Sequence, residues 1–176
     1  MDFYEKTLCM RIVSSQFLFG LILFSVAIFA IHNAEEIMGM DSWAHINLPA
    51  EYAELYETNS FRIAALLLLF LYAVIAGSLW LRDLPFLRST FLIGANAILT
   101  NGIVHAVISL LLNQPMPGIC SAILLIIPLF SAIIWLTYQL NWTTPVTLLG
   151  YFMAGAVAQF LLASGALVLS RYLLRM

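Results

Sequence analysis

The sequence predicts an all-α fold, a polytopic membrane bundle of about five transmembrane helices that forms a single domain over residues 1–176. Of the 176 residues, 63% are apolar and only 9% are charged, whereas about a quarter of the residues of a soluble domain are charged. The apolar residues form five runs, each near the roughly 20 residues that a helix needs to cross the hydrocarbon core. The sequence lacks the alternating segments of about ten residues that are typical of a membrane β-barrel.

Short polar or proline-containing segments separate the five expected spans. The spans cover residues 12–38, 61–81, 85–112, 118–138 and 145–172. Gly39 is expected to end the first span as a C-terminal cap, and Ser60 is expected to begin the second as an N-cap. Pro128 predicts a kink in the fourth span, and the spacing of four between Gly150 and Ala154 predicts close packing of the fifth span.

The positions of the basic residues predict a multi-pass protein of the cell membrane with its N-terminus in the cytoplasm. Lys6 and Arg11 precede the first span, whereas the segment 39–60 carries four acidic residues and no lysine or arginine. Five spans then place the C-terminus on the outer side, together with the acidic segment. Arg171 and Arg175 conflict with this orientation, and a re-entrant fifth segment would remove the conflict.

The outer acidic segment 39–60 has two interpretations. Its residues Trp43, Tyr52 and Tyr56 alternate with acidic residues, so it is either an aromatic interfacial helix at the level of the lipid headgroups or a lid over a site in the bundle. His45 is expected to be a solvated surface residue, with a role as a fourth metal ligand as the alternative. The lipid bilayer is the expected partner. The net charge of −2 gives no sign of nucleic-acid binding, and the sequence leaves open whether the protein is a homo-oligomer.

Ionisable residues near the end of the first span predict a functional site. His32, Glu35 and Glu36 are three and four residues apart, so they share one face of a helix. Burial of such groups in lipid is costly, and they are expected to face the bundle interior, a cavity or a bound ion. The alternative is a structural role, either as interhelical hydrogen-bonding groups or as carboxylates that reach the headgroup region.

The third span carries a matching pair, Asn101 and His105, which are four residues apart and also share a face. The first and third spans run in the same direction, and their histidines lie about seven and eight residues before the expected span ends. At 1.5 Å per residue, His32 and His105 both lie roughly 10 Å inside the same membrane face. The two imidazoles can therefore converge on one centre. Gln159 in the fifth span is interpreted as an interhelical hydrogen-bonding residue.

Two histidines and a carboxylate form the ligand set of many catalytic zinc sites, in which a fourth position is open to water. The motif His-x-x-Glu-Glu is also close to the inverted zincin motif His-x-x-Glu-His. His32, Glu36 and His105 are therefore the expected ligands of a divalent metal, with zinc favoured and iron as an alternative. Glu35 is the expected catalytic base that activates the metal-bound water. Asn101 is expected to bind a substrate oxygen or to orient a ligand.

Three landmarks occur in order along most of the chain: His32-Asn33-Ala34-Glu35-Glu36, then Asn101 with His105, then Pro117-Gly118. With these landmarks the sequence resembles the HXXEE family of small integral membrane proteins. The resemblance implies a membrane topology and an enzymatic role. It also implies that the histidine and the two glutamates of the first landmark share one functional site with Asn101 and His105. It names no reaction.

Three classes of function fit these residues. The leading hypothesis is a metal-dependent integral membrane enzyme, a hydrolase that acts on a lipid or another hydrophobic small molecule in the membrane. A site roughly 10 Å below the membrane face is within reach of lipid ester, ether or amide groups and of water. The first alternative is a membrane redox protein, in which His32 and His105 bind haem or the cluster holds non-haem iron. The second is a small ion- or proton-coupled transporter, although the sequence has no clear inverted repeat.

Overall fold

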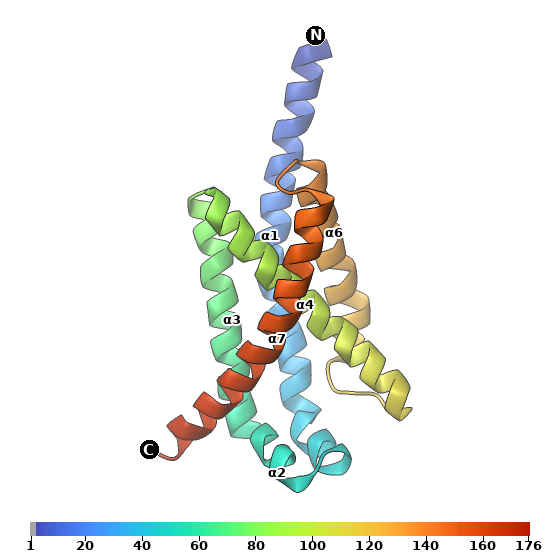
Figure 1. Cartoon of the computed structure of the whole chain (residues 1–176), viewed down its shortest axis with the longest axis vertical. Coiled ribbons are helices and arrows are strands. Elements are labelled where there is room, and N and C mark those ends of the chain that lie inside the picture. Colours follow the sequence, from blue (N-terminus) through green and yellow to red (C-terminus); the bar gives the residue numbers. More distant parts are fainter. Residues whose placement is uncertain (1–2) are drawn as a thin grey trace.

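The computed structural model describes the backbone of residues 3–176 and the side chains of residues 15–176. Within these residues all regular structure is helical. The elements are α1 Phe3–Asn47, α2 Ala50–Ala53, η1 Glu54–Tyr56, α3 Thr58–Leu81, α4 Pro85–Leu112, α5 Ile119–Ser121, η2 Ala122–Ile126, α6 Ile127–Gln139 and α7 Pro145–Leu174. In this part of the chain, five helical segments are long and apolar enough to cross a membrane, with α5, η2 and α6 joined into the fourth. The predicted all-α bundle is confirmed (Figure 1).

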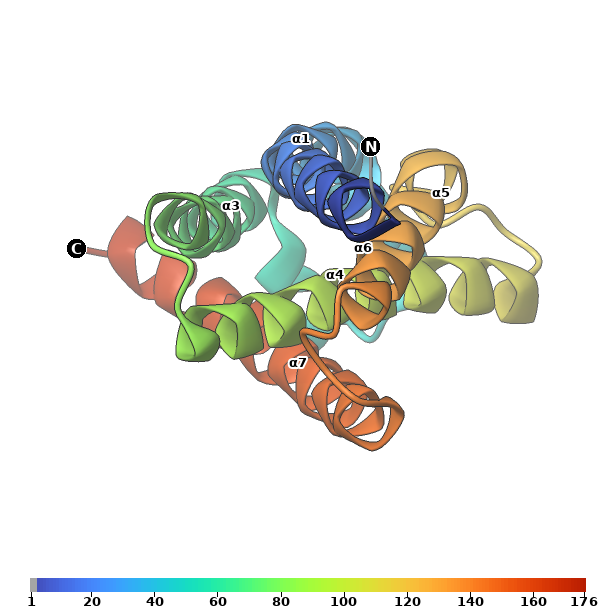
Figure 2. The same ribbon diagram turned by 90° about the horizontal axis from the view of Figure 1, so that it is seen from above.

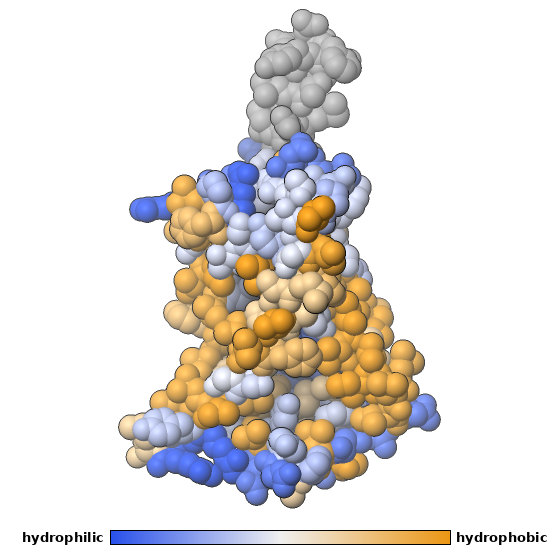
Figure 3. Space-filling view, in the orientation of Figure 1, coloured by the Kyte–Doolittle hydropathy of each residue, from blue (hydrophilic) through white to orange (hydrophobic). Residues whose placement is uncertain are grey.

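Much of the apolar surface of the long helices faces outward. It forms a hydrophobic band around the middle of the molecule, and hydrophilic residues gather at the end that carries α2 and η1 (Figure 3). This arrangement suits a bilayer, because lipid favours apolar side chains and helices satisfy their own backbone hydrogen bonds. The start of α1 and the end of α7 lie at opposite ends of the bundle (Figure 1), as an odd number of spans requires.

The main apolar core lies in the half of the bundle nearer to the connection between α3 and α4. Its largest buried members include Leu18, Tyr72, Phe91 and Phe130, which come from four different spans. The hydroxyl of Tyr72 is paired there with Ser25 over 2.6 Å, so the buried polar atoms of this half are satisfied locally. The half nearer to α2 holds a smaller apolar cluster around Ala64, Ala166 and Leu167, together with polar residues of the first and third spans.

The first helix is longer than the sequence predicted. Gly39 does not end it, and α1 continues to Asn47, so the predicted cap was wrong. A Cβ atom at Gly39 would lie 3.1 Å from Cγ of Pro117; the glycine therefore allows the loop between α4 and α5 to approach the helix closely. The predicted outer segment 39–60 is divided among the end of α1, the short helices α2 and η1, and the start of α3.

Asp41 of α1 caps the start of α3. Its Oδ2 atom accepts hydrogen bonds from the backbone N–H of Thr58 over 3.1 Å and from the hydroxyl of Thr58 over 2.7 Å. The predicted N-cap at Ser60 was wrong, because α3 begins two residues earlier and Ser60 is buried inside its first turn. A carboxylate from another helix thus satisfies a free N–H at the positive end of α3.

The end of α7 is joined to η1 by an ion pair. Arg171 donates from Nη2 to Oε2 of Glu54 over 2.6 Å, and this hydrogen bond to the guanidinium lowers the pKa of Glu54 below its ordinary value. The pair explains how a basic residue can lie at the acidic end of the bundle. Since α7 is one uninterrupted helix, the re-entrant segment considered for the fifth span is not present.

The helices α4 and α7 cross at Gly155 (Figure 2). A Cβ atom at this glycine would lie 2.7 Å from Cβ of Asn96 and 2.8 Å from the backbone nitrogen of Ala97. The fifth span therefore packs closely, but the predicted pair was wrong, because a Cβ atom at Gly150 would meet no other atom within 4 Å and Ala154 is exposed. Beyond the crossing, the two helices diverge toward the hydrophilic end (Figure 1).

The fourth span contains an irregular stretch. The π-helical segment η2 precedes Pro128, which lies in the first turn of α6. Proline has no N–H to donate, so the regular hydrogen-bond pattern cannot continue through it. The disturbance predicted at Pro128 thus lies just before it. Ile126 of η2 packs against α4, where a Cβ atom at Gly102 would lie 2.8 Å from its Cγ2.

Candidate metal centre

Three ionisable side chains from two helices meet inside the bundle. Helix α1 contributes His32 and Glu36, one turn apart, and α4 contributes His105. The Oε1 atom of Glu36 lies 2.7 Å from Nε2 of His105 and 3.5 Å from Nε2 of His32. One possible ligand atom from each residue lies within 4.8 Å of the other two. The structure brings together the three residues that the sequence predicted as metal ligands, as their matching depths on parallel helices implied.

The three-residue cluster is almost completely enclosed by protein. The exposed fraction is 0% for His32, 1% for His105 and 7% for Glu36. The two imidazole rings lie edge to face, with centroids 5.0 Å apart. A carboxylate buried to this degree needs a positive partner, because the loss of its hydration is costly. A protonated histidine or a bound cation would provide that charge.

A chain of hydrogen bonds fixes the orientation of His32. Gln159 of α7 donates from Nε2 to Oδ1 of Asn101 over 2.8 Å, and Nδ2 of Asn101 lies 2.9 Å from Nε2 of His32. On the other side of the ring, Nδ1 lies 2.8 Å from Oγ of Ser121, whose hydroxyl donates to the carbonyl of Gly118 over 3.2 Å. These partners are all satisfied when His32 carries its proton on Nδ1. Its Nε2 lone pair then accepts from Asn101 and lies on the side of the cluster.

His105 is held by fewer protein groups. Its Nδ1 atom is buried and has no hydrogen-bond partner among the described residues. Its Nε2 atom contacts Glu36, so the carboxylate orients the ring. Burial of an unpaired polar atom is unfavourable, and this nitrogen is therefore a group that a ligand in the site would satisfy.

Gly118 forms a further wall of the cluster. It precedes the fourth span with a φ of 90°, a conformation that residues with a Cβ atom rarely adopt. A Cβ atom here would lie 2.9 Å from Cγ of Glu36, 2.9 Å from Cε1 of His32 and 3.0 Å from Cε1 of His105. The sequence marked Pro117 and Gly118 as the third landmark. In the structure, the backbone of Gly118 packs directly against all three members of the cluster.

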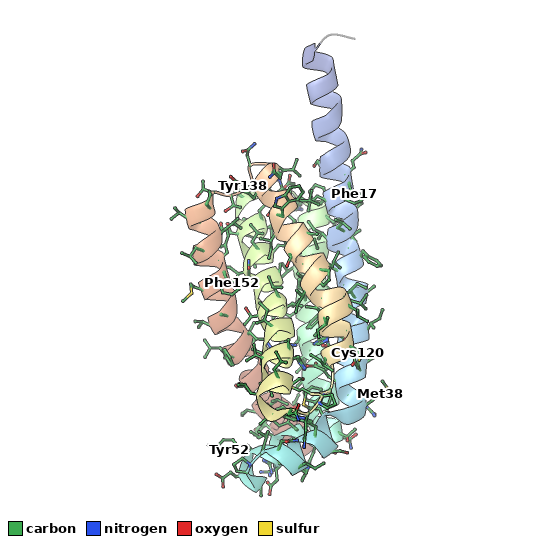
Figure 4. The ribbon with its side chains drawn as sticks, turned by 90° about the vertical axis from the view of Figure 1, so that its right-hand side faces the viewer. Phe17, Met38, Tyr52, Cys120, Tyr138 and Phe152 are labelled. Atoms are coloured by element: carbon green, nitrogen blue, oxygen red, sulfur yellow. The ribbon has the colours of Figure 1, made fainter. Side chains whose placement is uncertain are left out.

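Glu35 is not one of the three clustered residues. Its carboxylate accepts hydrogen bonds from the backbone N–H groups of Cys120 over 3.2 Å and Ser121 over 2.9 Å. It therefore stabilises the start of the fourth span, whose first N–H groups have no helical partner, and joins that start to α1. Figure 4 shows Cys120 at this start, beside α1. Because Ser121 also contacts His32, Glu35 acts on the cluster through Ser121. Sequence reasoning missed Ser121, since a single serine at the start of an apolar span carries no signal of its own.

A cavity of about 240 Å³ adjoins the cluster. It lies between α1, α3, α4, α7 and η1, and its walls are mostly apolar. Glu36, His105, Asn101 and Gln159 give it one polar region. No lysine or arginine is among the described residues that line it. The arrangement suits a largely hydrophobic molecule that carries a small polar group.

A comparison with protein families finds one matching family. A family described as "Protein of unknown function with HXXEE motif" matches residues 23–134. The matched part contains the three-residue cluster, Glu35, Asn101 and Gly118, whereas Gln159 lies outside it. No curated protein and no solved structure matches the chain. Because the match covers more than half of the chain, this protein belongs to the family of unknown function that is defined by the HXXEE motif.

Proposed function

We propose that this protein is a metal-dependent integral membrane enzyme that hydrolyses a lipid or another molecule embedded in the membrane. The proposal is carried by the arrangement of His32, Glu36 and His105, two imidazoles and a carboxylate that are almost fully buried, with ligand atoms within 4.8 Å of one another. Catalytic zinc sites have three such protein ligands and keep a fourth position for water or substrate.

In this proposal His32 and His105 bind a divalent cation through ring nitrogens, and Glu36 binds it through its carboxylate. Zinc is the favoured cation. When bound, the cation would polarise a substrate carbonyl and lower the pKa of a coordinated water. Asn101 occupies the Nε2 lone pair of His32 and lies on the cavity wall. When the cation binds to that nitrogen, the amide would turn from His32 to hold a substrate oxygen.

Glu35 has a different role in this proposal from the one expected from the sequence. Both of its oxygens are engaged by N–H groups of the fourth span. A general base must lie within hydrogen-bond reach of the reacting water, and Glu35 is not one of the three clustered residues. The geometry therefore favours Glu35 as a positioning residue, which holds Ser121 and through it His32.

The same ligand set supports a second candidate, a non-haem iron redox enzyme. Two histidines and one carboxylate with open positions form the iron site of many oxygenases. A haem is disfavoured, because a porphyrin would have to fit between imidazoles whose centroids are only 5.0 Å apart. The identity of the bound metal distinguishes the hydrolase from the redox enzyme.

The test is elemental analysis of protein purified from membranes without chelator. We expect stoichiometric zinc in the wild type and its loss in His105→Ala. The matched control is His45→Ala, because His45 is an exposed surface residue, as predicted, and pairs with Asp41 outside the cluster. Stoichiometric iron would favour the redox enzyme. A wild type without metal, or a His105→Ala variant that retains it, would overturn the proposal.

A further inference from the structure

The helices α4 and α7 form a V beside the cluster. Their point of contact is Gly155, which packs against Ala97. On the hydrophilic side of this point, the hydrogen bond between Asn101 and Gln159 joins the two helices over 2.8 Å. Beyond that bond the helices separate (Figure 1). The polar region of the cavity therefore lies at the apex of the V.

The cavity reaches the outer surface between the arms of this V. Val104 on α4 and Phe160, Ala163 and Ser164 on α7 line it. The side chain of Phe160 is 61% exposed and Ser164 is exposed as well, so this wall faces the bilayer. The opposite walls are formed by buried residues of α1 and α3, such as Phe29. The opening is therefore lateral, into the lipid.

The size of the cavity limits what can enter it. Its volume of about 240 Å³ is below the range of roughly 300–1,000 Å³ that is usual for pockets that enclose a whole ligand. A lipid with two acyl chains would not fit inside. A single chain can remain between the arms of the V while its polar group reaches the cluster.

The charges around the cavity limit which polar group of a substrate can bind there. Glu36 is an acidic group on the wall, and neither lysine nor arginine is among the described lining residues. An anionic group such as a phosphate would have the bound cation as its positive partner, without the lysine or arginine side chains that usually bind it. The amides of Asn101 and Gln159 offer neutral donors and acceptors, which suit an ester or an amide.

We propose that a single-chain lipid with a neutral ester or amide group enters the site sideways from the bilayer, between α4 and α7. This inference deepens the proposed function and relies on it for the chemistry at the cluster. The chain lies against Val104, Ile108, Phe160 and Ala163, and the polar group meets Asn101 and the cluster. A soluble substrate would have to take another route.

The test is photolabelling in phosphatidylcholine vesicles with a fatty-acid ethanolamide that carries a diazirine in its chain. Mass spectrometry of the labelled protein is expected to place the label on Val104, Ile108, Phe160 and Ala163. Ala163→Trp fills the opening, and it should lower this labelling roughly tenfold by steric exclusion. The matched control is Leu161→Trp, on the same helix at a lipid-facing position that does not line the cavity; it should label like the wild type.

Two additions keep the test decisive. Ser164→Trp narrows the exposed edge of the same opening, and it replaces Ala163→Trp if that variant does not fold. A probe with the same chain but a phosphate headgroup should not label the V. Equal labelling of the tryptophan variants and the wild type, or label spread evenly over all lipid-facing helices, overturns lateral access. Equal labelling by the phosphate probe overturns the neutral group.

The metal content of the same samples separates the two proposals. Metal without labelling of the V overturns the lateral route and leaves the metalloenzyme standing. Labelling of the V without metal overturns the metalloenzyme and supports the lipid-binding site. If neither metal nor labelling of the V is found, the metalloenzyme and the lateral route are both wrong.

Discussion

The Nε2 atom of His105 lies 2.7 Å from the carboxylate of Glu36, and this contact joins α4 to α1 at the centre of the candidate site. The Glu36→Gln substitution keeps the shape of the side chain and removes its charge. We expect metal binding to be lost, and the free energy of unfolding in the presence of metal to fall by about 1–3 kcal/mol. Elemental analysis and chemical denaturation in detergent measure the two effects. Glu51→Gln, at an exposed position of α2, should change neither, and a Glu36→Gln protein with full metal content would contradict the ligand assignment.

Gly118 offers a second test, because its backbone touches every member of the cluster. In Gly118→Ala, the positive φ costs about 1–2 kcal/mol for a residue with a Cβ atom, and the new methyl group displaces the two imidazoles and the carboxylate. Metal affinity should fall while the helix content measured by circular dichroism stays unchanged. Gly77→Ala is the control, since a Cβ there has no atom within 4 Å. Unchanged metal affinity in Gly118→Ala would show that the cluster does not depend on this wall.

Substitutions of Glu35 distinguish a positioning residue from a catalytic base. The N–H groups of Cys120 and Ser121 donate to different oxygens of Glu35, and a glutamine keeps one of these two acceptors. Glu35→Gln should therefore keep metal and part of the turnover. Glu35→Ala should lose both in part, with metal affinity lowered about tenfold, as is usual when a group that orients a ligand is removed. Complete loss of turnover in Glu35→Gln with full metal content would restore the general-base role.

The hydrogen bond from Gln159 to Asn101 extends the site to α7. Gln159→Leu removes the donor and leaves Asn101 free to turn away from His32. In the metal-free protein, we expect the nitrogen NMR signals of His32 to report a mixture of tautomers. Gln139→Leu, at the exposed end of α6, serves as the comparison. If the His32 signals are identical in both variants, the hydrogen-bond chain does not set the tautomer.

Helical periodicity accounts for what the sequence predicted correctly. Five apolar runs gave the five spans, because span length is fixed by the thickness of the bilayer. His32 and Glu36 are one turn apart, and His105 lies at the same depth on a parallel helix, so their meeting follows from helix geometry. The interhelical role expected for Gln159 is also present.

The remaining details depend on contacts that spacing does not encode. Glu35 and Glu36 are neighbours, and a turn of about 100° between them sends one to the cluster and the other to the fourth span. Glycine is typical of helix ends, yet Gly39 lies inside α1, where Pro117 packs against it. Asp41 replaces Ser60 as the cap of α3 only because the two helices meet there. Such outcomes follow from tertiary packing and require the three-dimensional structure.

The uninterrupted course of α1 has a mechanical consequence. His32, Glu36 and the capping residue Asp41 belong to one continuous rod, so they cannot shift relative to one another without breaking helical hydrogen bonds. Any movement that opens the cluster must therefore come from the elements that pack against α1. The short loop between α4 and α5 packs on Gly39 and ends at Gly118. Displacement of this loop would expose the cluster while α1 remains in place.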